Sequence, residues 1–191
     1  MSPRTEQQFQ EIRENKREQI LEAALKCFST NGYYKASIAE IAKEAGISKG
    51  LIYNYFESKD VILKELVWGV YEEFFKRFEF PKDLVMTEEC FVSYINISID
   101  IVADDPNRFK LYFALFTQPH IMDLFKADLM QKMEPFILMF LNYYTEKGYE
   151  NPMAMMRFVS AAIDGVQMHI MLDKENFPVE DVRKILLKMF V

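Results

Sequence analysis

Residues 37–56 read SIAEIAKEAGISKGLIYNYF, and this stretch decides the fold. Ser37 followed three residues later by Glu40 has the pattern of a capping box, which predicts that a short helix begins at Ser37. Gly46 can take the positive φ of a tight turn, and Ser48 can cap a second short helix. Two short helices joined by a turn that contains glycine have the form of a helix-turn-helix, whose second helix can enter the major groove of DNA.

The second helix of this pair has two unlike sides. At about 100° per residue, Ile52 and Phe56 share one side and should pack on the first helix. An exposed Leu51 on the opposite side fits contact with a thymine methyl group, and Lys49 could read guanine or neutralise a phosphate. Gly50 is unfavourable in a helix by about 1 kcal/mol relative to alanine, so it makes sense where the backbone must approach another surface closely.

Other groups near the turn can hold the DNA backbone. Tyr53, Asn54 and Tyr55 offer hydroxyl and amide donors to phosphate oxygens, contacts that fix register without reading sequence. The N-terminus of the helix capped by Ser37, and that of a later helix capped by Ser58, add partial positive charge. We therefore expect a DNA-binding corner in this part of the chain.

The rest of the chain is expected to be helical. The alternating apolar and polar pattern of strands is missing, while helical spacing recurs throughout, so the predicted class is all-α with about nine helices. An opening helix over about 16–31 should end at Asn31-Gly32. Thr87 marks one helix start and prolines at first helical positions mark four more: Pro106, Pro119, Pro152 and Pro178. Pro135 should kink or break its helix near Glu134.

Charge and composition divide the chain near residue 60. The 191 residues carry 23 Lys and Arg against 29 Asp and Glu, but residues 1–60 hold nine of each and are neutral. Eleven of the 12 methionines follow residue 60. We expect a DNA-binding domain over 1–60, with an N-terminal arm over 1–15, and a helical regulatory and dimerisation domain over 61–191. The negative net charge lies outside the corner, so it does not argue against DNA.

Several classes of protein are disfavoured. The sequence has no export signal and no apolar run of the roughly 20 residues that span a bilayer, which predicts a cytoplasmic protein without a membrane partner. Cys27 and Cys90 give no disulfide framework and no metal-ligand spacing, so we expect no metal and no cofactor. No nucleophile-base pair, glycine-rich phosphate loop or carboxylate cluster has catalytic spacing, and we expect no enzyme.

The chain resembles the TetR/AcrR family of bacterial transcriptional regulators. The resemblance is strong over the first 65 or so residues, and segments further along are similar to the family's ligand domain. It rests on these stretches: FSTNGY (28–33), SIAEIA (37–42), AGISKG (45–50), YNYF (53–56) followed by Ser58-Lys59, then DPNRF (105–109) and AIDG (162–165).

The resemblance implies nine helices, a homodimer, a DNA-binding domain made of the first three helices and a regulatory domain made of the rest. By position, it implies contacts to bases or adjacent phosphates from Ser48, Lys49, Gly50 and Leu51. It implies contacts to the DNA backbone from Ser37, Tyr53, Tyr55 and Lys59. The family commonly has threonine where this chain has Leu51, so the operator sequence cannot be transferred.

The helix over 152–172 is apolar on two sides, so it must be buried on both. One side can serve the core and the other a second copy of the chain, and a monomeric helical core is the alternative. We expect a two-fold interface from these residues: Met156, Val159, Ile163, Val166, Ile170, Val182, Ile185, Leu186 and Met189. The other side of the helix carries Phe158, Ala161, Ala162, Gly165, Met168 and Leu172.

Aromatic residues and methionines of the second domain adapt to irregular apolar ligands. The predicted pocket residues are Phe91, Tyr94, Phe113, Phe116, His120, Met139, Tyr143 and Met168, although ordinary core packing is the alternative for each. The hypothesis is a dimeric repressor that binds double-stranded operator DNA and is released by a small, mainly apolar effector. A helical protein-interaction module without DNA binding and an enzyme that uses the cavity are the competing interpretations.

Overall fold

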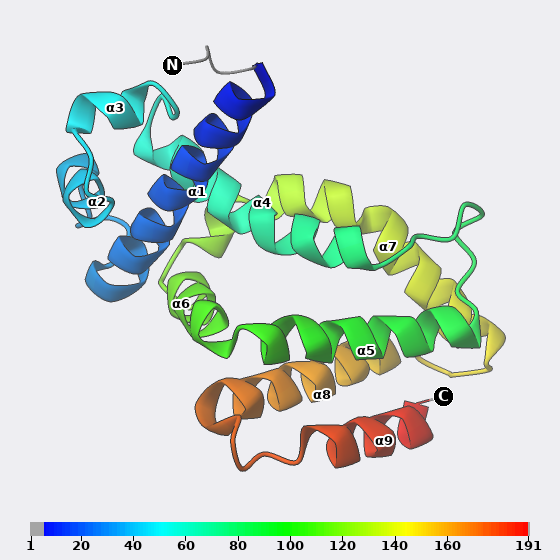
Figure 1. Ribbon diagram of the computed structural model, residues 1–191. Helices are drawn as coiled ribbons and strands as arrows, with labels where there is room; N and C mark the ends of the chain where they lie inside the picture. The colour runs from blue at the N-terminus through cyan, green and yellow to red at the C-terminus, as the bar shows by residue number, and fades with distance from the viewer. Residues whose placement is uncertain (1–5, 191) are drawn as a thin grey trace. The chain divides into compact units, whose positions relative to one another are not determined.

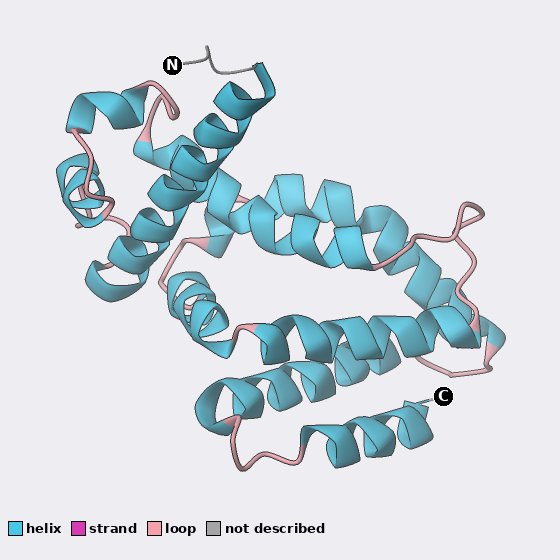
Figure 2. Cartoon of the chain, viewed as in Figure 1, coloured by secondary structure: helices cyan, strands magenta, loops and turns pink. Residues whose placement is uncertain are grey.

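The computed structural model describes residues 6–190 of the chain, and within them the fold is entirely helical (Figures 1 and 2). The prediction of an all-α protein with about nine helices is confirmed for these residues. The helices are α1 (Glu6–Asn31), α2 (Ile38–Glu44), α3 (Lys49–Tyr53), α4 (Lys59–Arg77), α5 (Glu88–Asp104), α6 (Pro106–Phe116), α7 (Lys126–Glu146), α8 (Pro152–Asp173) and α9 (Val179–Phe190), with one 3₁₀ turn at Met122–Leu124. None of these helices is long and apolar enough to cross a membrane.

Most predicted helix starts are confirmed. Ser37, Ser48 and Thr87 each accept a hydrogen bond from a backbone N–H of the following helix, and α6 and α8 begin at Pro106 and Pro152. The first helix begins earlier than expected, at Glu6, because the exposed residues 6–15 are rich in good helix formers although they lack an apolar stripe. Most of the predicted arm is therefore helix, and its Arg4 lies outside the described residues.

Two proline predictions need correction. No helix begins at Pro119: a turn follows it, and α7 begins at Lys126. The side chain of the preceding Gln118 is bonded to the end of α1, which holds this segment as a turn. The helix α7 runs through Pro135 without a break, so the predicted break near Glu134 is wrong, whereas the predicted kink stays a prediction.

The chain forms two compact units. Unit 1 contains the residues up to Val70 together with Leu111–Ile121, and unit 2 contains Tyr71–Lys110 and the residues from Met122 onward. The helices α4 and α6 each contribute to both units. The compact units therefore do not follow the predicted boundary at residue 60, because the first half of α4 buries its apolar side chains within unit 1. The division of DNA binding and regulation between 1–60 and 61–191 stays a prediction.

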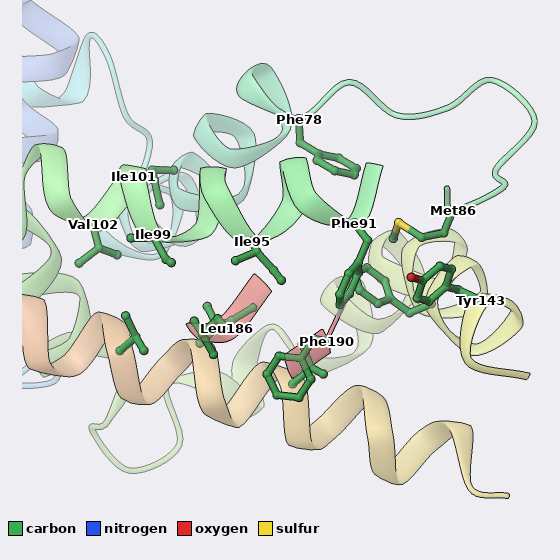
Figure 3. Close-up of a cluster of buried hydrophobic side chains, with 14 of the residues drawn as sticks. Phe78, Met86, Phe91, Ile95, Ile99, Ile101, Val102, Tyr143, Leu186 and Phe190 are labelled. Atoms are coloured by element: carbon green, nitrogen blue, oxygen red, sulfur yellow. The ribbon is translucent and has the colours of Figure 1, made fainter. Parts of the chain in front are cut away.

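Unit 2 has its own hydrophobic core, formed by α5, α7, α8 and α9 (Figure 3). On α5, Phe91, Ile95 and Ile99 are fully buried, and Leu186 and Phe190 of α9 close the same cluster. The contribution of α8 is the row Val159, Ile163, Val166 and Ile170. This row was predicted to lie at a dimer interface.

The predicted dimer interface is therefore wrong for five of its nine residues. Val159, Ile163, Val166, Ile170 and Leu186 are buried in the core of their own chain, because α5 and α7 cover that side of α8. Met156 and Val182 also pack against this core, whereas Ile185 and Met189 are more than half exposed. The free apolar side of α8 is the opposite one.

Candidate nucleic-acid interface

The turn between α2 and α3 is built by local hydrogen bonds. The Glu40 backbone N–H donates to Ser37 Oγ at 3.2 Å, and the Ser37 N–H donates back to Glu40 Oε2 at 2.7 Å, which completes the predicted capping box. The hydrogen bonds that the Ser37 N–H and hydroxyl donate to the Glu40 carboxylate lower its pKa. Gly46 has φ +63°, as expected for the turn, and Ser48 Oγ accepts from the Leu51 N–H at 3.2 Å. The helix-turn-helix geometry is thus fixed by two serines, one glutamate and one glycine.

The two sides of α3 differ as predicted. Ile52 is fully buried and Phe56, just after the helix, is 1% exposed, so these residues hold α3 in unit 1. Lys49 and Gly50 are exposed at the start of α3, and Tyr53 is 49% exposed at its end. Of the other predicted contact residues, Ser37, Ser48 and Asn54 are exposed, and Leu51, Tyr55 and Lys59 are partly exposed.

Contacts among the described residues do not explain why position 50 is a glycine. A Cβ atom built at this position meets nothing within 4 Å, and the backbone is not in the left-handed region that favours glycine. Glycine weakens a helix relative to alanine, so the chain alone would be served better by a larger residue. The space in front of Gly50 is therefore open, and the absence of a side chain matters only to something that approaches from outside.

Lys59 is engaged inside unit 1. Its ammonium donates to the backbone oxygens of Tyr33 at 2.8 Å and Ala36 at 2.9 Å, and it lies 4.5 Å from the centre of the Tyr33 ring. The Tyr33 hydroxyl in turn donates to Asp60. These contacts tie the start of α4 to the α1–α2 connection, so Lys59 orders the region around Ser37 in addition to any contact with phosphate.

Gln118 completes the same connection, and the sequence gave no sign of it. Its Nε2 donates to the Phe28 backbone oxygen at 2.7 Å, and its Oε1 accepts from the Tyr33 N–H at 2.8 Å. One side-chain amide therefore satisfies two backbone groups at the end of α1, although 85 residues or more separate the partners. The only signal was the Gln118-Pro119 pair, which favoured a helix start instead.

A sequence model described as "Bacterial regulatory proteins, tetR family" matches residues 20–66, which span the end of α1, the corner and the start of α4. The chain thus contains a TetR-family domain over these residues. It is 56% identical over 50 residues to the HTH-type transcriptional regulator HbdR of Aromatoleum sp. (strain CIB), and 30% identical over 125 residues to the fatty acid metabolism regulator protein of Bacillus subtilis (strain 168). These matches cover 26% and 65% of this chain, but 22% and 61% of the two relatives.

The TetR fold extends over nearly the whole chain. A solved structure from Shewanella sp. PV-4, described as a tetR family transcription regulator, superposes with a TM-score of 0.71 and covers 92% of this chain and 95% of its own. Its sequence identity of 21% is low, so this likeness concerns the fold alone.

The predicted ligand-pocket residues are divided between the two units. Phe91, Met139 and Tyr143 pack in the core of unit 2 with the partly buried Tyr94, and the Phe91 and Tyr143 rings stack at 5.2 Å. Phe113, Phe116 and His120 belong to unit 1, and Phe113 is half exposed. Met168 is 40% exposed because it lies opposite the buried row of α8. Phe113 and Met168 are thus partly exposed, and their place in a ligand pocket stays a prediction.

No metal site is found in the part of the chain that the structure describes, since no group of three or more His, Cys, Asp or Glu side chains there could hold an ion. Both cysteines are free, with Cys27 buried and Cys90 partly buried. Burial raises the pKa of each thiol, so neither is a reactive thiolate near neutral pH.

Proposed function

We propose that this protein is a homodimeric repressor of the TetR family that binds double-stranded operator DNA through α3 and is released by a small, mainly apolar effector. The observation that carries the proposal is the outer side of α3, where Lys49 and Tyr53 flank open space at Gly50. HbdR, which shares 56% of the residues over its matched segment, is named as a transcriptional regulator. Such a protein acts where its DNA is, in the bacterial cytoplasm.

In this proposal the contacts divide by chemistry. Lys49, Gly50 and Leu51 approach base edges in the major groove, where Lys can pair with guanine and an apolar side chain can pack on a thymine methyl group. Ser48 borders them at the N-terminus of α3. The DNA backbone is held by Ser37, Tyr53, Asn54 and Tyr55, which carry hydroxyl or amide groups. Lys59 contributes through the α1–α2 connection that it orders.

The proposed dimer uses the free apolar side of α8 and α9. Phe158 is 55% exposed and Leu172 is 68% exposed, and they lie on one side of α8 with Ala161, Gly165 and Met168. Their spacing alternates between three and four residues, which is the period of a helix-packing seam. On α9, the exposed Ile185 and Met189 were already part of the predicted interface. A second copy would cover the same face by two-fold symmetry.

In this proposal the dimer has two states that differ in the spacing of its α3 helices, and an effector releases DNA by favouring one of them. Operator half-sites lie about 34–36 Å apart, so a ligand that favours another spacing of the two α3 helices lowers DNA affinity. The helices α4 and α6 each contribute residues to both units, so a shift in unit 2 can pass along them to unit 1.

The test begins with DNA selected by the purified protein from a randomised duplex library. Fluorescence anisotropy then compares the wild type with Lys49→Ala and Tyr53→Ala, each of which should lower specific affinity at least tenfold. Lys26→Ala is the matched control, because it removes the same charge from unit 1. The exposed ion pair with Glu44 that it breaks contributes little to the stability of the fold. Failure of the wild type to enrich any sequence would favour a protein-interaction module instead.

The dimer is tested separately by analytical ultracentrifugation. Phe158→Glu and Leu172→Glu place charge in the proposed interface and should give monomers at micromolar concentration. A wild-type protein that sediments as a monomer at that concentration refutes the dimer.

A further inference from the structure

Two charged side chains of opposite sign interrupt the apolar length of α8. Arg157 and Asp164 are the only Asp, Glu, Lys or Arg residues in 152–172. Both are exposed, although α5, α7 and α9 pack against other parts of this helix (Figure 1). At about 100° per residue, seven residues fall about 20° short of two full turns. Arg157 and Asp164 therefore lie almost in line along one edge of α8.

This charged edge borders the free apolar side of α8. Arg157 precedes Ala161 by four residues and Asp164 precedes Met168 by four residues, so each charge is a direct neighbour of one residue on that side. Charges at the border of an apolar helix interface keep contact with water and still reach the partner helix, where they determine which partner is accepted and in which orientation. Arg157 and Asp164 are placed to meet whatever covers the apolar side.

Neither charge is used inside the subunit. Among the residues that the structure describes, the side chains of Arg157 and Asp164 form no hydrogen bond and no ion pair. They do not pair with each other, because seven residues of helix separate them by about 10.5 Å along its axis. Arg183 of α9, by contrast, pairs with Asp100 of α5 at 2.5 Å within the same unit. The two charges of α8 are therefore available to a partner.

A second copy of α8 offers the complementary charges in one orientation. When two copies lie antiparallel about a two-fold axis, the same edge of both helices meets, and each contact occurs twice. Arg157 then faces Asp164 of the partner subunit if the helices cross midway between these residues, beside Ser160 and Ala161. The small Ala161 lets the helices approach closely there. A parallel pair would put this edge against the opposite one, which carries none of these charged residues.

We propose that α8 recognises a second copy of this chain through two symmetric ion pairs, each between Arg157 of one subunit and Asp164 of the other. The inference rests on the proposed dimer and specifies its geometry, namely antiparallel copies of α8 that cross beside Ser160 and Ala161. The apolar side chains supply the buried area, and the ion pairs reject partners that bring like charges together. A related regulator with other charges at these two positions is thereby kept out of mixed dimers.

Charge reversal tests these pairs on the full chain. Arg157→Glu brings acid against acid and Asp164→Arg brings base against base, so each variant alone should dimerise at least tenfold more weakly than the wild type in analytical ultracentrifugation. An equimolar mixture of the two should dimerise about as tightly as the wild type, because the introduced glutamate faces the introduced arginine and the unchanged Asp164 faces the unchanged Arg157. Native mass spectrometry identifies the mixed dimer by its mass. Lys82→Glu is the matched control, since it reverses one exposed positive charge outside α8 and α9 and should dimerise normally.

Two results overturn the inference: a single reversal that dimerises as tightly as the wild type, or a mixture of the two variants that stays monomeric. Recovery in the mixture also shows that both variants are folded, because a misfolded chain would not regain a partner. The Phe158→Glu variant separates this inference from the dimer itself. Monomers from Phe158→Glu together with unaffected charge reversals refute the ion pairs alone, whereas a monomeric wild type refutes the proposed dimer and the pairs with it.

Discussion

Gly50→Ala should separate the stability of the fold from DNA binding, because the two respond to this change in opposite directions. The added methyl group meets no atom of the chain within 4 Å, so it creates no clash in the free protein. Alanine is more favourable than glycine by about 1 kcal/mol in a helix interior, and about half of that is expected in the first turn of α3. For a chain of this size the melting temperature should rise by about 1–2 °C.

The same methyl group should weaken DNA binding. If the backbone at Gly50 touches DNA closely, the extra group overpacks the contact, which costs about 1–3 kcal/mol and corresponds to a roughly 5- to 150-fold loss of affinity. Differential scanning fluorimetry measures the first effect, and fluorescence anisotropy with the selected DNA measures the second. Gly69→Ala in α4 is the control, because a Cβ atom there also meets nothing within 4 Å and it should stabilise without changing DNA affinity. Unchanged DNA affinity of Gly50→Ala would refute the proposed placement of α3.

Three further predictions follow from other contacts. Gln118→Ala removes both hydrogen bonds to the end of α1, so it should lower the free energy of unfolding by about 1–3 kcal/mol and speed hydrogen exchange at the Tyr33 amide; an unchanged exchange rate would contradict the reasoning. The pKa of Glu40 is lowered by its hydrogen bonds with Ser37, so its stabilisation is present above the ordinary glutamate pKa of 4.5 and is lost as pH falls through the lowered pKa. Glu40→Gln should therefore lose less stability than the wild type in circular-dichroism melts between pH 6 and pH 3. The corner carries few basic side chains, so the logarithm of DNA affinity should fall against the logarithm of salt concentration with a slope well below about 10, and a steeper slope would mean that Arg13, Lys16 and Arg17 contact DNA.

The corner was predictable because its signals are local. Ser37 and Glu40 are three residues apart, and Gly46 and Ser48 determine the turn that separates α2 from α3. Each residue acts on backbone groups within one helical turn of itself. The fold class and most helix starts follow from the same kind of short-range evidence.

Short-range signals of this kind could not predict the dimer interface or the turn after α6. Both sides of α8 are apolar, and only the packing of α5 and α7 determines that Val159 and Ile163 are core while Phe158 and Leu172 stay exposed. The turn at Gln118 depends on partners in α1 and just after it. Periodicity describes one helix at a time, so it cannot say which neighbour covers which side.

Because Gln118 seals the end of α1, the corner that carries α3 is not a contiguous piece of polypeptide. A fragment cut after residue 60 or 70 would lose that amide and leave the Phe28 oxygen and the Tyr33 N–H without it. Transferring the proposed DNA-binding corner to another regulator, by engineering or by gene fusion, therefore requires residues 111–121 to be transferred as well. Residues 111–121, from the proposed regulatory part, thus complete the proposed DNA-binding part, which limits how freely the two can recombine.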